Sequence, residues 1–360
     1  MPFRPIAAFA GFLLAIFAAA PATAEKVGER RLVAHEASAA LRSASHSDAL
    51  RVTVWYPAAR DAAEAPLAIG PPDDPFFLSG DAARDAPFAD DRPRPVVLLS
   101  HGFGGSARMM GWFGTALARE GYVVVAVDHP GNNGADPMTV AGAVLFWERP
   151  GDLAAALAAT MADPAIAPHL DANRLGVAGF SAGGFTSLVA AGARVDPERL
   201  VRFCAAHPDD GVCAPQKEFA YTPAEEAQLL ARPEVAAEIA RAHGDLAIAG
   251  VKSAFVMAPA IVQSLDPDSL ARLRIPVRIL LGDADTVAPP ATNGEAAAAA
   301  LPDASLTVLP KVGHYDFLAD CTPAGDAAVP LCKTEAPREA THKTALDAAT
   351  TFFAATLGSP

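Results

Sequence analysis

The sequence predicts an α/β protein with an open, mixed and mostly parallel sheet of roughly eight strands, covered by helices on both faces. From residue 95 onward, short apolar runs alternate with helical stretches, which is typical of a parallel sheet buried on both faces. Before that point, the run RVTVWY at 51–56 alternates as a half-exposed strand does. Hydrophobic residues make up 51% of the chain, which is ample for one large core.

Each expected element follows from its own run of residues. The expected parallel strands are Val96–Ser100, Tyr122–Val127, Leu175–Ala178, Val251–Met257, Val277–Leu281 and Leu306–Leu309. Leu32–His35 and Leu50–Tyr56 form the expected antiparallel entry to the sheet. The expected helices are Met109–Glu120, Gly151–Ala162, Ala182–Ala191 and the closing helix Arg338–Leu357.

Two segments interrupt this alternation within an expected single domain, residues 25–360. Residues 57–94 are rich in Pro, Asp and Ala and are predicted to form a long surface loop. Residues 192–250 are predicted to form a helical insertion, with polar helices at Pro223–Ala231 and Pro233–Ala242. A lid over a site and extra packed helices are equally good interpretations of this insertion.

The N-terminus has the pattern of a signal peptide, residues 1–24. Arg4 precedes the apolar run Ile6–Ala20, and Ala22-Thr23-Ala24 is a small-x-small cleavage signal, so cleavage is expected after Ala24. The apolar run is shorter than the roughly 20 residues that span a bilayer, so no stable membrane anchor is expected. The mature chain is therefore predicted to be periplasmic or secreted.

Charge and cysteine content narrow the class further. The formal net charge is −13 with no basic stripe, which argues against a nucleic-acid partner because phosphate binding needs clustered Lys and Arg. An even number of cysteines in an exported chain indicates disulfides. Sequence proximity favours pairing Cys204 with Cys213 and Cys321 with Cys332; other pairings and four unpaired thiols are the alternatives.

The stretch GVAGFSAGGFT at 176–186 contains the candidate nucleophile, Ser181. It lies between Gly179 and Gly183, after the expected strand RLGVA and before the expected helix AGGFTSLVAAGA. A serine on a sharp strand-to-helix turn needs small neighbours two residues away on each side. Such a serine attacks a carbonyl only if a base takes its proton and a third group holds that base.

A candidate base and two candidate acids follow later strands in the order Ser, Asp, His. His314 lies in the loop KVGHYDF after the last expected strand, whereas His342 falls in the closing helix at an expected surface position. The acid is Asp283 or Asp285 in GDADTV, and the sequence pattern does not separate the two. One of them is expected to bind backbone amides in a turn.

The loop His101-Gly102-Phe103-Gly104-Gly105 after the strand PVVLLS supports two different hypotheses. In the first, the backbone N–H groups of Phe103 and Ala182 hold the oxyanion formed by serine attack. In the second, Gly102, Gly104 and Ala107 are a loose dinucleotide fingerprint and Asp128 binds a ribose, as in a nicotinamide-dependent oxidoreductase. The second leaves the serine, aspartate and histidine unexplained; a non-catalytic binding protein is a further alternative.

Other polar and aromatic residues carry weaker interpretations. Trp112, Phe180, Phe185 and Phe317 either line an acyl pocket or belong to the core, and the core is favoured. Glu148, Arg149 and Asp152 are expected to form a structural ion pair. The segment His207–Asp210 is interpreted as a solvated loop because it lacks a metal-ligand spacing. The mechanism based on Ser181, His314 and an aspartate requires no metal or organic cofactor.

Five segments together resemble the α/β-hydrolase superfamily. They are HGFGG at 101–105, WERPGD at 147–152, GFSAGG at 179–184, GDADTVAPP at 282–290 and GHYDF at 313–317. More narrowly, they resemble exported bacterial proteins described as predicted dienelactone hydrolases, related to platelet-activating-factor acetylhydrolases and polyester hydrolases. In those families the acid occupies the last position of G-x-x-D, which implies Asp285.

The resemblance implies an exported serine hydrolase that cleaves carboxylic esters through an acyl-enzyme on Ser181. True dienelactone hydrolases use a cysteine nucleophile, and this chain has a serine at that position. The expected partner is a small-molecule or lipid-like ester. Phospholipid acetyl, polyester, lactone and peptide substrates are alternatives for the same three residues.

Overall fold

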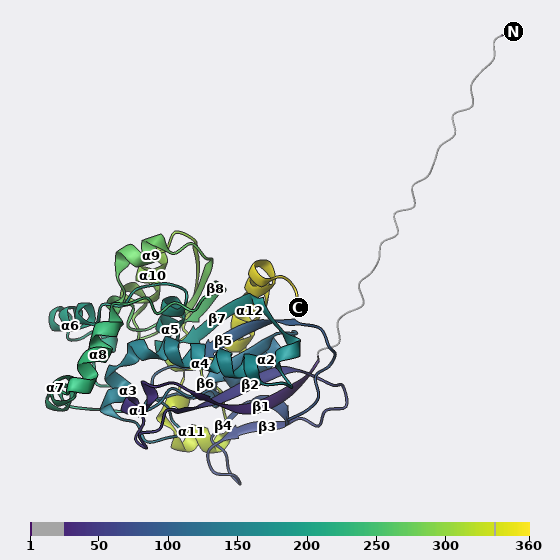
Figure 1. Cartoon of the computed structure of the whole chain (residues 1–360), viewed down its shortest axis with the longest axis horizontal. Helices are drawn as coiled ribbons and strands as arrows, with labels where there is room; N and C mark the ends of the chain where they lie inside the picture. The colour runs from purple at the N-terminus through teal and green to yellow at the C-terminus, as the bar shows by residue number, and fades with distance from the viewer. Residues whose placement is uncertain (2–24, 335) are drawn as a thin grey trace.

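A computed structural model describes residues 1, 25–334 and 336–360 of the chain (Figure 1). The predicted signal peptide and its cleavage site lie outside the described residues, apart from Met1. Within the described part, the strands form one 11-stranded sheet. Its main path runs β10-β9-β8-β7-β5-β6-β2-β1-β4-β11, and β3 pairs with β4 off this path.

The parallel half of the sheet contains all six strands predicted after residue 95. They are β5 Arg94–Ser100, β6 Val123–Val127, β7 Leu170–Phe180, β8 Val251–Met257, β9 Val277–Gly282 and β10 Ala304–Leu309. All neighbours in this half are parallel. Their carboxyl ends therefore meet at one edge, where the expected site loops begin.

The other half of the sheet, which is antiparallel except where β1 pairs with β4, is larger than predicted. The entry strands are confirmed as β1 Lys26–His35 and β2 Ala49–Ala58. The prediction that residues 57–94 are a surface loop is wrong, because this segment contains β3 Ala65–Ile69 and β4 Phe77–Arg84. The two-residue strand β11 Asp320–Cys321 pairs with β4. Together, β3, β4 and β11 bring the sheet from the predicted eight strands to eleven. Leu67 and Phe77 are buried, and their burial fixes this added hairpin against the core.

Alternating side chains of the sheet enter two separate cores. In β5, Val96 and Leu98 belong to one core, and Val97 and Leu99 to the other. Helices α4 Arg149–Ala162 and α5 Ala182–Ala190 pack in the first core, and α2 Gly111–Arg119 and α12 Arg338–Leu357 in the second. The described shorter helices are α1 Ala39–Arg42, α3 Val140–Val144, α9 Pro267–Arg272, α10 Gly294–Ala300 and α11 Pro323–Ala328. None of the described helices is long and apolar enough to cross a membrane.

The insertion after α5 is helical, as predicted, with one helix more than expected. It contains α6 Pro197–Ala206, α7 Pro223–Leu230 and α8 Pro233–Ala242, which lie together at one end of the molecule (Figure 1). Proline at the first helical position starts each of them, and Thr222 and Glu225 form a capping box on α7. Leu229 and Val235 are buried in the first core, so the insertion is packed onto the domain.

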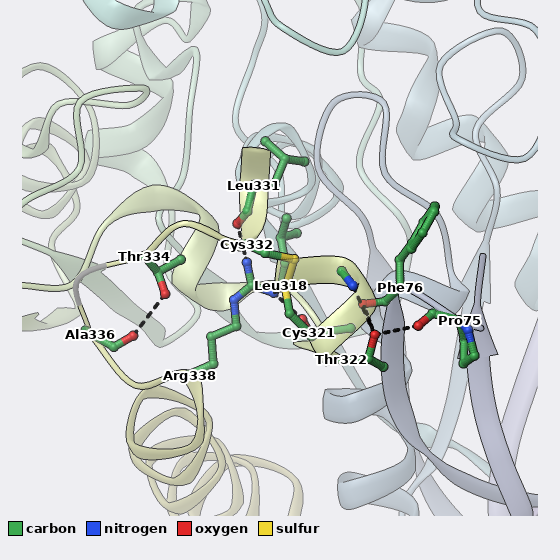
Figure 2. Close-up of a disulfide and its surroundings, with 12 residues drawn as sticks. Pro75, Phe76, Leu318, Cys321, Thr322, Leu331, Cys332, Thr334, Ala336 and Arg338 are labelled. Carbon is green, nitrogen blue, oxygen red and sulfur yellow. Dashed lines mark hydrogen bonds between the residues drawn. A yellow bond between two sulfur atoms is a disulfide. The ribbon is translucent and has the colours of Figure 1, made fainter. Parts of the chain in front are cut away.

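Both predicted disulfides are confirmed: Cys204 pairs with Cys213, and Cys321 pairs with Cys332. The second one lies beside Arg338, whose guanidinium donates to the Cys321 Sγ at 2.8 Å and to the carbonyl oxygen of Leu331 (Figure 2). The Thr322 hydroxyl donates to the carbonyl oxygen of Pro75, which joins this segment to the turn before β4.

The prediction that His342 lies at the surface is wrong. Its ring is buried and stacks on Trp112 with the ring centroids 3.7 Å apart. Its Nε2 donates to the carbonyl oxygen of Leu318 at 2.8 Å, and burial lowers the pKa of the ring. The helix α12 is thus buried on a face that includes a polar side chain, which a hydrophobic pattern does not reveal.

Replacing Cys321 and Cys332 together by serine tests the contribution of this crosslink to stability. The two residues are 11 positions apart, so we expect the free energy of unfolding to fall by about 2.5 to 3 kcal/mol as the unfolded chain regains loop entropy. Urea denaturation of the variant and the wild-type protein measures the difference. Coincident unfolding curves would contradict the expectation.

Candidate active site

Ser181 occupies a strained turn between β7 and α5. Its φ of 56° and ψ of −121° lie outside the regions that a serine ordinarily adopts. A Cβ placed on Gly183 would lie 2.0 Å from the carbonyl oxygen of Ser100, and one on Gly179 would lie 2.1 Å from the carbonyl oxygen of Gly183. Only glycine fits at these two positions, and their packing holds the turn against the end of β5.

The structure brings Ser181, His314 and Asp285 into one hydrogen-bonded chain. Ser181 Oγ is 2.8 Å from His314 Nε2, and His314 Nδ1 is 2.7 Å from Asp285 Oδ2. All three side chains are about 95% buried. The other carboxylate oxygen of Asp285 accepts from the backbone N–H groups of Val287 and Ala288 at 2.9 and 2.8 Å. These two bonds fix the carboxylate in the direction of the histidine.

The two candidate acids have different surroundings. Asp283 is exposed and its Oδ1 accepts from the backbone N–H of Lys311 at 2.6 Å, as a turn carboxylate does. Asp285, two residues later, contacts the imidazole of His314. The sequence pattern left the pair open, and the geometry separates them because the chain turns sharply after β9.

The two candidate oxyanion donors come from different strand ends. Ala182 is the first residue of α5, so its N–H has no partner within the helix. Phe103 lies in the glycine loop after β5, where Gly104 N–H donates to Asn132 Oδ1 at 3.0 Å and Gly105 N–H donates to the carbonyl oxygen of Gly102 at 3.2 Å. Phe103 and Ser181 line the same pocket.

That pocket is small, with a volume of about 70 Å³. Its apolar wall consists of Phe103, Met109, Met110, Phe180, Val287, Leu318 and Leu331. Of the four aromatic candidates, Phe180 reaches the pocket, whereas Trp112, Phe185 and Phe317 are buried in the two cores. The insertion contributes Gln216 and Glu218, so part of it forms a wall of the pocket.

Comparison with known proteins finds a family model that matches part of the chain and a solved structure with a similar fold. The model of the family "Serine aminopeptidase, S33" matches residues 91–230. A ferulic acid esterase from Streptomyces cinnamoneus superposes with a TM-score of 0.60 at 23% identity, over 94% of this chain and 92% of that one. The chain has the α/β-hydrolase fold. A comparison with curated protein sequences finds no match.

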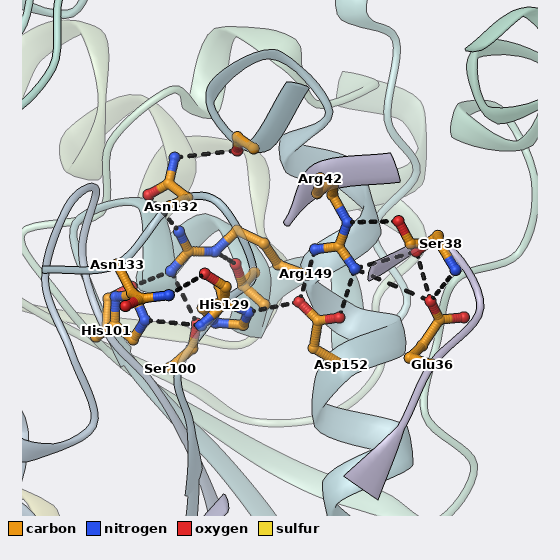
Figure 3. A network of polar contacts seen from close by, with 12 residues as sticks. Glu36, Ser38, Arg42, Ser100, His101, His129, Asn132, Asn133, Arg149 and Asp152 are labelled. Atoms are coloured by element: carbon orange, nitrogen blue, oxygen red, sulfur yellow. Dashed lines mark hydrogen bonds and ion pairs between the residues drawn. The ribbon is translucent and has the colours of Figure 1, made fainter. Parts of the chain in front are cut away.

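A buried polar network adjoins the glycine loop that follows β5 (Figure 3). Asp152 on α4 accepts from both ends of the Arg42 guanidinium at 2.6 and 2.8 Å and from His129 Nδ1 at 2.8 Å. Its predicted partner, Arg149, is not paired with it directly. Glu148 instead lies 3.2 Å from Arg241. The ion pair predicted among Glu148, Arg149 and Asp152 is therefore not formed, and each of the three residues has a different partner.

His101 is held neutral inside this network. Its Nε2 accepts from the backbone N–H of His129 at 3.1 Å, and its Nδ1 donates to the carbonyl oxygen of Gly102 at 2.7 Å. Burial and the neighbouring His129 and Arg149 hold the pKa of His101 well below its usual value. The ring therefore holds the first turn of the loop in place through these two hydrogen bonds.

Arg149 joins the glycine loop after β5 to α5, the helix that follows Ser181. Its guanidinium donates to the carbonyl oxygen of His101 and to Thr186 Oγ1 on α5 at 3.1 Å. It also lies 3.4 Å from Ser100 Oγ at the end of β5. Burial lowers the pKa of Arg149 to about 9. Arg149, which is drawn in Figure 3, thus connects the loop that carries Phe103 to the helix that begins at Ala182.

The carboxylate of Asp128 has a structural partner on each oxygen. Oδ1 accepts from the backbone N–H of Ala107 at 2.7 Å, and Oδ2 accepts from Arg51 Nε at 3.1 Å. These bonds anchor the glycine loop to the end of β6. They occupy the group that the dinucleotide hypothesis assigned to a ribose, whereas Ser181, His314 and Asp285 converge as the hydrolase hypothesis requires.

Sequence reasoning did not identify Arg42, His101, His129, Glu218 or Tyr315 as site residues. Arg42 and Asp152 are 110 positions apart, so no local spacing signals their pairing. The available signal was the presence of polar residues directly after strands, as in His101 and His129 after β5 and β6.

Replacing Arg149 by methionine tests whether it positions the oxyanion loop. We expect kcat for p-nitrophenyl acetate to fall about ten-fold or more with KM changed little, because the side chain orients the loop and does not touch substrate. Steady-state kinetics with circular dichroism on the same samples measures this. Arg232→Met, at the N-cap of α8, removes an exposed ion pair with Glu234 and is the control, which should retain kcat. A folded Arg149→Met protein with wild-type kcat would refute the positioning role.

Proposed function

We propose that this protein is an exported serine hydrolase that cleaves carboxylic esters through an acyl-enzyme on Ser181. The observation that carries the proposal is the buried chain from Ser181 Oγ through His314 to Asp285, at the wall of a pocket. A serine, a base and a base-orienting carboxylate in this order of contact are the requirements of acyl transfer.

The steps follow from the geometry. His314 Nε2 takes the hydroxyl proton as Ser181 Oγ attacks the ester carbonyl, and Asp285 stabilises the imidazolium through the Nδ1–H bond. The N–H groups of Ala182 and Phe103 stabilise the oxyanion. The intermediate collapses as His314 returns the proton to the leaving alcohol. A water molecule, activated by the same histidine, then releases the carboxylic acid and restores Ser181.

An ester is favoured over a peptide as the substrate by the pocket. Its apolar wall and its volume of about 70 Å³ suit a short acyl group. The fold match to a ferulic acid esterase agrees with ester cleavage, and the family name, serine aminopeptidase, gives peptide cleavage as the second candidate.

Export is supported by two observations. The N-terminal residues have the signal-peptide pattern, and two disulfides close short loops among the described residues. Disulfides persist in oxidising compartments, which agrees with a periplasmic or secreted location.

An ester chain-length panel tests the class and the substrate together. We expect the wild-type protein to hydrolyse p-nitrophenyl acetate and butyrate much faster than the palmitate, because the pocket is small. Ser181→Ala should reduce the turnover of every active ester to background while retaining the wild-type circular dichroism spectrum. An aminoacyl p-nitroanilide is included in the panel. Turnover of the anilide without turnover of the esters would favour the peptidase, and turnover by Ser181→Ala would exclude Ser181 as the nucleophile.

The two aspartates provide a matched pair of substitutions. Asp285→Asn should lower kcat roughly 10³- to 10⁴-fold, because the imidazolium of His314 loses its charged partner and the neutral ring is no longer held in the tautomer that accepts the serine proton. Asp283→Asn changes an exposed turn carboxylate and should alter kcat only a few-fold. Kinetics with p-nitrophenyl butyrate measures both. A larger loss for Asp283→Asn would reverse the assignment of the acid.

A further inference from the structure

We propose that Glu218 is a specificity-determining residue that accepts a hydrogen bond from an O–H or N–H group of the substrate, so that the preferred esters carry such a donor near the scissile bond. The inference rests on the proposed ester hydrolysis at Ser181. It adds a polar recognition element to a pocket whose wall is otherwise mostly apolar.

Glu218 reaches the site from the insertion and packs on the oxyanion loop. A Cβ placed on Gly104 would lie 2.6 Å from the Glu218 Cβ, so the two segments are in direct contact. Gly104 has a φ of 62°, which a glycine adopts without strain. Glu218 thus lines the same pocket as Ser181 and Phe103, one of the proposed oxyanion donors.

The segment that carries Glu218 is anchored close to the catalytic loops. The Cys204–Cys213 disulfide closes the chain just before it. Thr292 Oγ1 donates to Asp210 Oδ2 at 2.8 Å, which connects the insertion to the loop after β9. The disulfide and this hydrogen bond therefore restrain the insertion segment that precedes Glu218, and they connect it to the loops around Ser181.

One oxygen of Glu218 is fixed by the residue after the catalytic histidine. The Tyr315 hydroxyl donates to Glu218 Oε1 at 3.1 Å. Burial, and then the nearby Glu218 carboxylate, raises the pKa of Tyr315, so the phenol stays protonated and remains a donor. This bond joins the two sides of the pocket and orients the carboxylate.

The other oxygen, Oε2, is buried and has no hydrogen-bond partner among the described residues. A buried carboxylate oxygen without a partner is unfavourable, and burial of a substrate group against it is favourable only if that group donates. A hydroxyl or a protonated amine supplies the missing bond, whereas a methyl group or an anion does not. Sites built to bind a polar group discriminate strongly against analogues that lack it.

Matched ester pairs that differ only in this donor test the inference. On the acyl side, ethyl 3-hydroxybutyrate is compared with ethyl 3-methylbutyrate. On the alcohol side, 2-hydroxyethyl butyrate is compared with propyl butyrate, and protonated 2-(dimethylamino)ethyl butyrate with 3-methylbutyl butyrate. Acid release in a pH-stat gives kcat/KM for each. We expect a preference for the donor-bearing member of about ten-fold or more in at least one pair.

Three variants assign that preference to Glu218. Glu218→Met keeps the length of the side chain but removes both oxygens, and should lower the ratio in the preferred pair toward one. Tyr315→Phe removes the bond that orients the carboxylate and should lower the ratio in part. Glu226→Gln changes the charge of the same insertion outside the pocket lining and is the control, with an expected wild-type ratio.

The outcomes separate this inference from the proposed function. Hydrolysis of esters with a ratio near one in every pair, or an unchanged ratio in Glu218→Met, would overturn the role of Glu218 and leave the Ser181 hydrolase intact. The pair with the larger ratio identifies the donor as hydroxyl or ammonium and its side as acyl or alcohol. Failure to hydrolyse any member of the pairs by a protein that turns over p-nitrophenyl butyrate would overturn the role of Glu218 alone, whereas failure with both sets of esters would overturn both proposals.

Discussion

The close approach of the turn at Ser181 to the end of β5 is the contact on which the candidate site depends. With no side chain at position 183, the start of α5 packs directly on the carbonyl of Ser100, the last residue before the glycine loop. This contact therefore sets the distance between Ser181 and the segment that carries Phe103. A Cβ here would push the two apart, because interiors packed at this density transmit small displacements rather than absorb them.

The buried polar network around Arg149 fixes the direction of the same glycine loop. Burying the guanidinium of Arg149 is unfavourable, as the lowering of its pKa shows, and hydrophobic residues of similar volume would often stabilise a core as well. An apolar residue could not, however, bond at once to the His101 carbonyl and to Thr186. The network is best understood as exchanging some stability for the fixed direction of a loop whose own glycines allow many conformations.

The parallel strands and the positions of the candidate residues Ser181 and His314 could be predicted from sequence because their signals are local, whereas the choice between Asp283 and Asp285 depended on a family resemblance. Continuous apolar runs identify β5 to β10, and the glycines around Ser181 identify the turn. The hairpin of β3 and β4 was missed because Pro71, Pro72 and Pro75 give its turn the composition of a loop. His342 was misplaced, and Arg42 missed, because their burial depends on partners far away in the chain, Trp112 and Asp152.

Glu218 illustrates the same limit at the level of function. The strands and the turns after them fix what chemistry is possible, and they have recognisable patterns. The group that selects the substrate comes from an insertion, where a single carboxylate among several acidic residues has no distinguishing neighbour in sequence. Only its contact with Gly104, its bond to Tyr315 and its unpartnered oxygen distinguish it, because all three are properties of the folded chain. In this fold, the residues proposed for the reaction lie in strand-end turns that can be recognised from sequence. The residue proposed to select the substrate lies in an insertion, where sequence alone does not reveal it.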